Sequence, residues 1–177
     1  MPGSGTQFET ERLVIRELRE EDLAAVLPVY TSNPEYLALN EGSGGEPGRY
    51  DLDMLGRDFV VAQMTPGRTM AGIFLKGGDE PIGVLDWMEQ NPTDGRPWLG
   101  LLIIRADHQR RGFASETLDA FVERLRSRGA RTVRAGVIER NEGACEFARR
   151  LEFEPISSVA MRMASTEKVI VVERRLG

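Results

Sequence analysis

The sequence of 177 residues contains one cysteine, Cys145, and one histidine, His108. One cysteine cannot form an intramolecular disulfide, and the two residues together cannot supply a Cys/His zinc cluster, so we expect no metal. The chain also lacks any apolar run near the ~20 residues that cross a bilayer, and residues 1–10 lack the basic and apolar parts of a signal peptide. We therefore expect a cytoplasmic protein with no membrane partner.

An excess of positive charge is also missing. The chain has 23 Lys and Arg against 28 Asp and Glu, a formal net charge of −5, which does not produce the positive field that gathers nucleic acid. Arg105, Arg110, Arg111 and the arginines of 124–134 could form a basic stripe, but acidic neighbours such as Asp107 dilute it. We expect no nucleic-acid partner.

The remaining composition is typical of a folded protein. Hydrophobic residues make up 41% of the chain and charged residues 29%, and neither an internal repeat nor a low-complexity segment is present. The length suits one domain of ordinary size. We therefore expect a single domain over residues 1–177, as a monomer or a homodimer.

Apolar periodicity and turn residues predict an alternating order of strands and helices. The Gly-rich segment 41–48 predicts a loop, and the breakers between the three middle strands predict an antiparallel meander. Together the elements predict an α/β (α+β) fold with a mixed, mostly antiparallel sheet and helices on both faces. The predicted strands are 12–18, 69–76, 81–89, 97–105, 132–138, 157–163 and 169–175, and the predicted helices are 20–33, 50–64, 112–128 and 142–151.

The segment from Trp98 to Thr117 runs from a strand through a basic loop into a helix. The first N–H groups of a helix have no intrahelical partner, and the helix dipole adds positive charge there, so a phosphate can collect several hydrogen bonds. Arg110 and Arg111 add side-chain charge, and Gly112 allows close approach. The alternative is an ordinary solvated helix start. The segment matches neither a Walker A loop nor a dinucleotide fingerprint, which disfavours nucleotide hydrolysis and hydride transfer.

The loop sequence Gln109-Arg-Arg-Gly-Phe-Ala114 resembles the Gln/Arg-x-x-Gly-x-Gly/Ala acyl-coenzyme A signature of Gcn5-related N-acetyltransferases. The similarity is strongest over residues 80–155. Residues 10–16 also resemble the opening of the branches of that family that act on ribosomal proteins and small amines. Residues 33–69 carry no recognisable motif, although this region usually builds the acceptor site in the family.

This resemblance implies acetyl-coenzyme A as co-substrate and assigns a role to each part of the motif. The strand before the loop offers backbone groups to the pantetheine arm, the loop amides wrap the pyrophosphate, and an asparagine contacts the coenzyme near its pantetheine arm. That asparagine is also an ordinary helix N-cap residue. The implied coenzyme-binding residues are Leu102, Ile103, Ile104, Gln109, Arg110, Arg111, Gly112, Phe113, Ala114, Ser115 and Asn141.

Direct transfer to an amine needs a group that takes the proton of the amine. Asp86 and Glu89 are the candidate bases, because relatives often hold a carboxylate on the strand before the coenzyme strand; the alternative is a pair of solvent-facing hairpin carboxylates. Ala148 stands where many relatives have the tyrosine that protonates the leaving thiolate, so the acid is not assigned. We expect His108 to be structural or adjacent to phosphate, and Cys145 to be packed.

The sequence thus predicts an N-acetyltransferase that acts on a primary amine of a small molecule or a protein N-terminus. Acidic residues would attract a cationic acceptor to the expected entrance; solvated surface is their alternative role. A coenzyme A-binding sensor without catalysis is the alternative function. The acidic residues near the expected entrance are Glu35, Glu41, Asp51 and Asp53.

Overall fold

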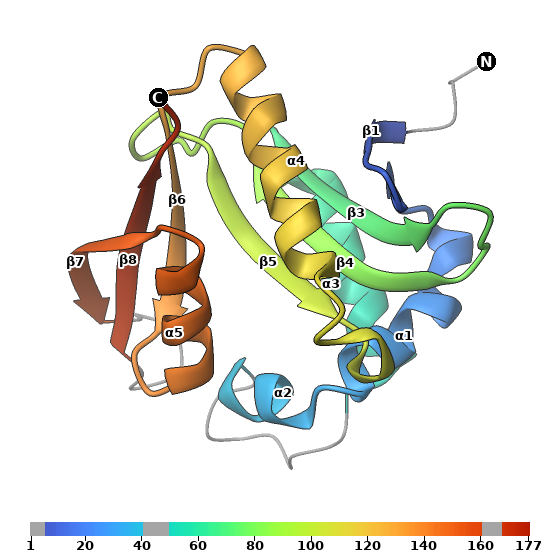
Figure 1. The fold of residues 1–177 in the computed structure, drawn as a ribbon. Coiled ribbons are helices and arrows are strands. Elements are labelled where there is room, and N and C mark those ends of the chain that lie inside the picture. The colour runs from blue at the N-terminus through green and yellow to red at the C-terminus, as the bar shows by residue number, and fades with distance from the viewer. Residues whose placement is uncertain (1–5, 41–49, 161–167) are drawn as a thin grey trace.

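The structure, a computed structural model, describes residues 6–40, 50–160 and 168–177. Within these residues one sheet has the strand order β1-β2-β3-β4-β5-β6-β8-β7 (Figure 1). Every neighbouring pair is antiparallel except β5 and β6, so the predicted mixed, mostly antiparallel sheet is confirmed. The strands are β1 (Thr6–Glu9), β2 (Leu13–Glu17), β3 (Arg68–Leu75), β4 (Pro81–Met88), β5 (Trp98–Ile104), β6 (Thr132–Ile138), β7 (Glu154–Ala160) and β8 (Lys168–Arg175).

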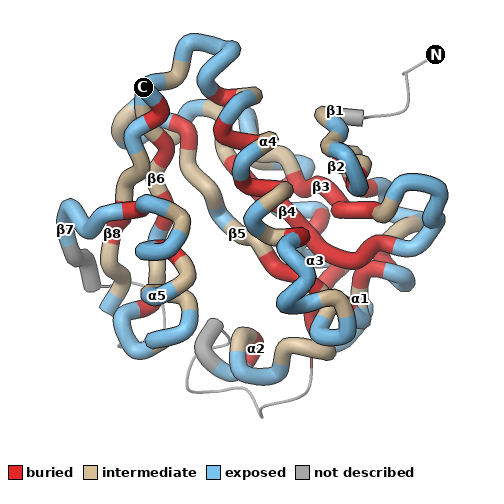
Figure 2. The backbone as a smooth tube through the Cα atoms, in the orientation of Figure 1, coloured by how far each residue is buried: buried red, intermediate tan, exposed pale blue. Residues whose placement is uncertain are grey.

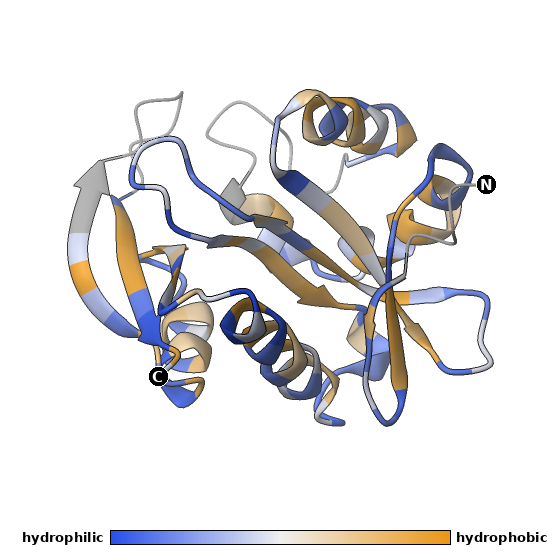
Figure 3. Cartoon of the chain, turned by 90° about the horizontal axis from the view of Figure 1, so that it is seen from above, coloured by the Kyte–Doolittle hydropathy of each residue, from blue (hydrophilic) through white to orange (hydrophobic). Residues whose placement is uncertain are grey.

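Helices cover both faces of the sheet, as predicted (Figures 1 and 3). Side chains of α4 and α5 pack into one hydrophobic core, and those of α1, α2 and α3 pack into a second core on the opposite face. None of the helices in the described part of the chain is long and apolar enough to cross a membrane. The helices are α1 (Leu23–Thr31), α2 (Pro34–Asn40), α3 (Leu52–Met64), α4 (Phe113–Ser127) and α5 (Glu142–Arg150).

Strand β4 lies at the centre of the molecule, where Figure 2 shows the densest burial. Its alternate side chains point to opposite faces, as the period of a strand requires. Leu85 and Trp87 face α4, and the Trp87 ring lies 5.4 Å from the ring of Phe121. Val84 enters the core beneath α1 and α3. Both faces of this strand are therefore dry, which explains its nearly continuous apolar sequence.

Two elements were not predicted from the sequence. Residues 34–40 form α2, because Pro34 occupies the first helical position, where its missing N–H is harmless and its fixed φ suits a helix. Residues 6–9 form β1. Their polar sequence does not indicate a strand, and hydrogen bonds to β2 stabilise the extended conformation. The loop predicted at 41–48 lies outside the described residues, and so does the last part of the strand predicted at 157–163.

The parallel pair β5 and β6 opens the sheet. The two strands pair only at Trp98 with Arg134 and Leu99 with Ala135, and then diverge (Figure 1). The divergence begins at Gly100, where the register against β4 shifts by one residue, as in a β-bulge. A Cβ atom at Gly100 would lie 3.3 Å from the carbonyl oxygen of Asp86, so the absence of a side chain permits this tight approach.

Candidate active site

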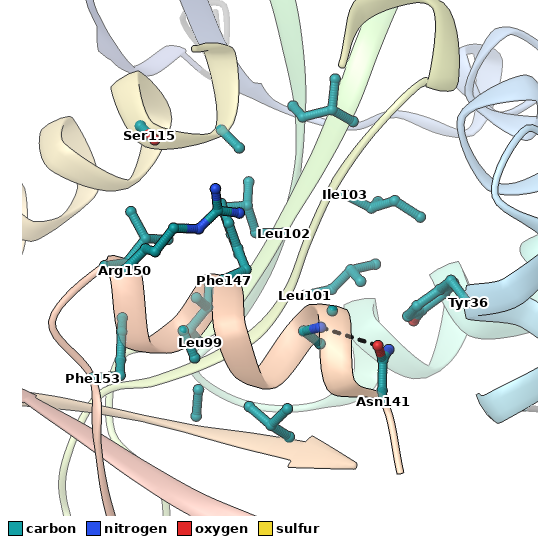
Figure 4. A pocket seen from close by; sticks show the side chains of 18 of the residues that line it. Tyr36, Leu99, Leu101, Leu102, Ile103, Ser115, Asn141, Phe147, Arg150 and Phe153 are labelled. Carbon is teal, nitrogen blue, oxygen red and sulfur yellow. Dashed lines mark hydrogen bonds between the residues drawn. The ribbon is translucent and has the colours of Figure 1, made fainter. Parts of the chain in front are cut away.

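The split between β5 and β6 forms a cavity of about 910 Å³ (Figure 4). Its walls come from both strands, from the loop and first turn of α4, from α5, and from the segment that begins α2. Of the residues expected to bind coenzyme, only Arg111 is not part of its lining. Those that line it are Leu102, Ile103, Ile104, Gln109, Arg110, Gly112, Phe113, Ala114, Ser115 and Asn141.

One wall of the cavity is the edge of β5 that turns toward β6. Beyond Leu99 this edge has no strand partner among the described residues, so backbone groups along 100–103 that point away from β4 remain available, whereas the Ile104 carbonyl accepts from Asn33 and Gln109. Ile103 enters the core under α1 to α3, and Ile104 enters the core under α4. The buried side chains hold the strand in place, and the backbone edge is the part that can bind an extended ligand.

The loop before α4 directs backbone donors at the same cavity. Arg110 and Gly112 both have positive φ, 61° and 82°, and Gly112 is the N-cap of α4. No side chain in the described structure caps this helix, whereas Asp51 caps α3 and Asn141 caps α5. The first N–H groups of α4 are therefore left for a ligand, together with the positive end of the helix dipole.

Gln109 holds this loop rather than pointing its amide at the cavity. Its Nε2 donates to the carbonyl oxygen of Ile104 at 2.8 Å and to Oδ1 of Asn33 at 2.7 Å. Asn33 donates to the same carbonyl at 3.0 Å, and the N–H of Ala106 donates to Oγ of Ser32 at 3.0 Å. The end of β5, the loop and the end of α1 are thereby joined, so Gln109 contributes to the site by positioning the loop.

The charged side chains of the cavity wall are basic. Arg110 and Arg150 line it, and no carboxylate does so in the described parts of the chain. Figure 4 shows the Arg150 guanidinium at the last turn of α5, directed toward the first turn of α4 where Ser115 lies. The Phe147 ring lies on the same wall, 5.9 Å from that guanidinium. This end of the cavity suits a polyanion with a flat ring attached.

His108 also reaches the cavity wall, but it is engaged with its neighbour. Its Nδ1 lies 2.8 Å from Oδ1 of Asp107, and Nε of Arg105 donates to the same oxygen at 2.7 Å. These contacts, first with Arg105 and then with His108, lower the pKa of Asp107 to about 2. His108 is therefore held by Asp107 at the cavity wall, and its expected position next to a phosphate stays a prediction.

Asn141 caps a helix and also lines the cavity. Its Oδ1 accepts the N–H of Ala144 at 3.0 Å and so caps α5, as Figure 4 shows. The described residues supply no partner for its Nδ2, and the residue lines the cavity. Capping therefore leaves the Nδ2 group free to donate, and the expected contact with coenzyme stays a prediction.

Asp86, one candidate base, is buried behind the bulge of β5. It is 6% exposed, and Nε and Nη2 of Arg68 donate to its two oxygens at 2.7 to 3.2 Å. Its Oδ1 lies 3.6 Å from the position of a Cβ atom at Gly100, and Gly100 lines the cavity. Asp86 therefore neighbours the cavity through the bulge, although it is not part of the wall.

Glu89, the other candidate base, lies on the α4 face of the sheet. Its Oε1 accepts from Nε1 of Trp87 at 3.2 Å and from Nη2 of Arg124 at 3.3 Å, and Nη1 of Arg128 is 3.5 Å away. Glu89 does not line the cavity. The structure thus places the two carboxylates on opposite faces of the sheet, and only Asp86 is adjacent to the opening.

Tyr36 is a wall residue that the sequence did not indicate. It comes from α2, and Figure 4 shows it at the end of the cavity near Asn141, away from Arg150. Its ring lies 6.5 Å from the ring of Tyr30. Burial, followed by the charges of Asp58 and Asp86, raises the pKa of Tyr36 to about 12, so the phenol is neutral in the physiological range. No motif marks this segment, which only the packing of α2 brings to the site.

The acidic residues expected at the acceptor entrance do not form a cluster on the wall. Glu35, Asp51 and Asp53 are exposed and do not line the cavity, and Asp51 caps α3. Glu41 lies outside the described residues. The end of the cavity at Tyr36 is therefore formed by neutral side chains among those the structure describes, including Asn33, Leu101 and Ile103.

Comparisons with known proteins agree with this architecture. The family model described as an acetyltransferase (GNAT) domain matches residues 12–154. No curated protein matches the sequence significantly. An acetyltransferase structure from Thermus thermophilus is 27% identical, with a TM-score of 0.74, and the match covers 95% of this chain and 99% of that one.

Two more distant structures share the fold. A GCN5-related N-acetyltransferase from Brucella melitensis is 13% identical, with a TM-score of 0.80 and coverage of 99% of this chain and 80% of that one. An acetyltransferase from Salmonella typhimurium that modifies the N-terminal serine of ribosomal protein L7/L12 is 16% identical, with a TM-score of 0.73 and coverage of 94% and 96%.

Proposed function

The chain belongs to the acetyltransferase (GNAT) domain family, and from this premise we propose that it transfers an acetyl group from acetyl-coenzyme A to a primary amine. The observation that carries the proposal is the cavity in which the split between β5 and β6 meets the uncapped start of α4. A strand edge suits an extended amide-containing arm, and a bare helix start suits a diphosphate. Coenzyme A contains both groups.

The residues present fit this donor along the whole cavity. The amides of 110–115 would bind the pyrophosphate, with Arg110 beside them, and the backbone of Leu102, Ile103 and Ile104 would pair with the pantetheine arm. Arg150 and Phe147 would contact the adenosine end, one through charge and the other through its ring. Arg111 would contribute its backbone, since its side chain does not reach the wall.

Acetyl-coenzyme A would supply an acetyl thioester to the opening beside Gly100. In the proposed step the nitrogen of a neutral amine bonds to the thioester carbon, the C–S bond breaks, and the sulfur leaves as a thiolate. The amine loses one proton and the thiolate takes up one, so no further reactant is needed. Asp86 is the residue we propose as the acceptor of the amine proton, through a water molecule at the bulge.

The neutral end of the cavity bears on the acceptor. An amine that enters beside Tyr36 and Asn33 meets no carboxylate among the described wall residues, so little in the wall stabilises its cationic form and the neutral amine is favoured there. An α-amino group, with a pKa of about 8, loses its proton at neutrality more easily than a lysine-type amine of about 10.4. We therefore propose an α-amine, such as a peptide N-terminus, as the acceptor class; the Salmonella neighbour modifies an N-terminal serine.

A thiol-release assay with acetyl-coenzyme A would test this function. The acceptor panel should contain peptides with free N-termini, the same peptides with blocked N-termini and one internal lysine, free amino acids and polyamines. We expect turnover with free N-termini and none with blocked ones. Coenzyme binding by calorimetry without turnover on any amine would favour the sensor alternative. No heat of binding and no rise in melting temperature at about 1 mM coenzyme would contradict both functions, because a ligand that binds the native state must raise its stability.

A further inference from the structure

A carboxylate lies behind the proposed phosphate site. Glu116 is in the first turn of α4, next to Ser115, the last residue of that turn on the cavity wall. An acidic side chain here stabilises the helix through its dipole. The same negative charge opposes a diphosphate bound to the same turn, unless a nearby cation neutralises it.

Residues from the connection between β1 and β2 neutralise this carboxylate. Arg12 donates to Oε2 of Glu116 through Nε at 2.7 Å and Nη2 at 2.6 Å, and its backbone N–H donates to Oε1 at 3.0 Å. Oγ1 of Thr10 donates to Oε1 at 2.5 Å. The Glu116 side chain is 20% exposed. Burial raises its pKa, but the hydrogen bonds from Thr10 and Arg12 outweigh this, so the pKa is lowered and the carboxylate stays ionised.

Arg12 also contacts the loop itself. Its Nη1 donates to the carbonyl oxygen of Arg111 at 3.1 Å, and its guanidinium lies 4.3 Å from the centre of the Phe113 ring. A Cβ atom at Gly112 would lie 3.4 Å from its Nη2. Arg12 and Glu116 do not line the cavity. Arg12 therefore packs against the loop on the side away from the cavity, which Gly112, Phe113 and Ala114 line.

We propose that Arg12 is a positioning residue for the coenzyme: it cancels the charge of Glu116 and holds residues 111–113 so that their amides face the diphosphate. The inference rests on the proposed function. The proposal connects a segment about a hundred positions earlier in the sequence to the affinity for coenzyme. Thr10 supports Arg12, because its hydroxyl is a second side-chain hydrogen-bond donor to Glu116.

A purely structural role makes a different prediction. If the pair only secures the start of α4, loss of Arg12 lowers thermal stability without a specific effect on an anionic ligand, and removal of Glu116 as well brings no recovery. If neutralisation matters, the damage in the Arg12 variant comes from the exposed charge of Glu116. Removing that charge then restores binding, although the hydrogen bonds are lost.

Calorimetric titration of coenzyme A into the wild type and a set of variants tests this. We expect Arg12→Ala to weaken binding about tenfold, the scale of one charge-assisted hydrogen bond reduced by the partial exposure of the pair. Glu116→Gln should bind at least as tightly as the wild type, and Arg12→Ala/Glu116→Gln should recover most of the loss. Thr10→Val, which leaves Arg12 in place, should weaken binding by a smaller factor, about threefold.

Ligand-free melting curves establish that each protein is folded at the assay temperature, and Thr10→Val and Arg12→Lys serve if Arg12→Ala is not. Wild-type affinity in Arg12→Ala would overturn the whole proposal, and a double variant as weak as Arg12→Ala would overturn the charge neutralisation on which it rests; either result leaves the proposed function standing. With Arg12→Lys, we expect affinity between the wild type and Arg12→Ala, since the charge remains while the contact with Arg111 is lost. No binding by the wild type would instead overturn the proposed function.

Discussion

Replacing Asp86 with asparagine separates the two candidate bases that the sequence left open. Asp86 lies beside the bulge at Gly100, whereas Glu89 is held by Arg124 and Arg128 on the α4 face. Asparagine keeps the shape of Asp86 and one acceptor oxygen for Arg68, but it cannot take a proton from an amine. The matched control is Glu89→Gln, the same chemical change on the opposite face of the sheet.

The cost in stability decides which substitution is usable. Removing one partner of a fully buried ion pair costs about 3–5 kcal/mol, but the Arg68 side chain is 29% exposed and can keep water. We therefore expect Asp86→Ala to lose about 2–3 kcal/mol of unfolding free energy. Asp86→Asn should lose about 1–2 kcal/mol, because an acceptor remains. The free energy of unfolding of a typical protein is about 5–15 kcal/mol, so we expect the asparagine variant to stay folded.

The effect on rate should be much larger than the effect on stability. A general base contributes about 10²–10⁴ in rate, so kcat/KM of Asp86→Asn should fall at least about a hundredfold, with the Kd for coenzyme A unchanged. Glu89→Gln should keep the wild-type rate within about threefold. The wild-type rate should rise with pH as the amine loses its proton, and the lower part of that profile should change only in the Asp86 variant.

The assay is thiol release under saturating coenzyme, with melting curves as the folding control. If Asp86→Asn keeps its rate and pH profile, Asp86 is not the base, and its function is to hold Arg68 on the second core. If Glu89→Gln loses activity instead, Glu89 is supported as the base. The proton of the amine must then be transferred to the α4 face of the sheet.

Further substitutions test the remaining parts of the site. Gly112→Glu should abolish coenzyme binding. Gly112→Ala should weaken it mildly, because a φ of 82° costs a non-glycine residue about 1–2 kcal/mol. Calorimetry compares the two variants, and wild-type affinity in a folded glutamate variant would show that the loop has another role. Arg150→Met should weaken binding of coenzyme A but not of dephospho-coenzyme A, and equal losses for both would contradict contact with the 3′-phosphate. Asn141→Ala should lose about 1 kcal/mol of stability through the lost cap and raise KM for acetyl-coenzyme A; an unchanged KM would leave only the cap. The pKa of Glu116 is lowered in the fold, so this carboxylate stabilises the protein above its unfolded pKa of about 4.3, and the stabilisation is lost as the pH falls through the folded pKa. In Glu116→Gln the unfolding free energy should therefore decrease less between neutral and acidic pH than in the wild type. The same decrease in both proteins would contradict this.

The elements around the site could be predicted because local signals mark their ends. Breakers at 77–79 and 91–95 separate β3, β4 and β5, and Gly129 follows α4 in a left-handed conformation. The start of α2 carries a signal too, but Pro34 directly follows the helix predicted at 20–33, so it indicates the end of that helix as well as the first residue of the next. A proline is compatible with both, and only the packing of Leu37 into the second core decides between them.

Side-chain roles within the motif were harder to predict than its position. The loop sequence indicates where the helix start and its amides lie, because Gly112 and the following periodicity are local. It does not indicate that the Gln109 amide turns to Asn33, which lies 76 positions earlier. Arg111 likewise belongs to the motif, although it is its carbonyl oxygen, rather than its guanidinium, that contacts Arg12. Partners that come from distant segments determine which atoms of a motif remain available to a ligand.

The two ends of the cavity are therefore encoded in different ways. The proposed donor end depends on backbone conformation, namely a left-handed glycine, an uncapped helix start and a strand edge that no described strand pairs with, and short local sequences can specify each of these. The proposed acceptor end depends on side chains such as Tyr36 and Asn33, which reach the cavity through the packing of α1 and α2. A fold that retains its donor end can change its acceptor through Tyr36, but not through Asn33, which also holds Gln109 and the end of β5. Substitutions at Tyr36 should accordingly alter which amines are acetylated while the Kd for coenzyme A stays constant.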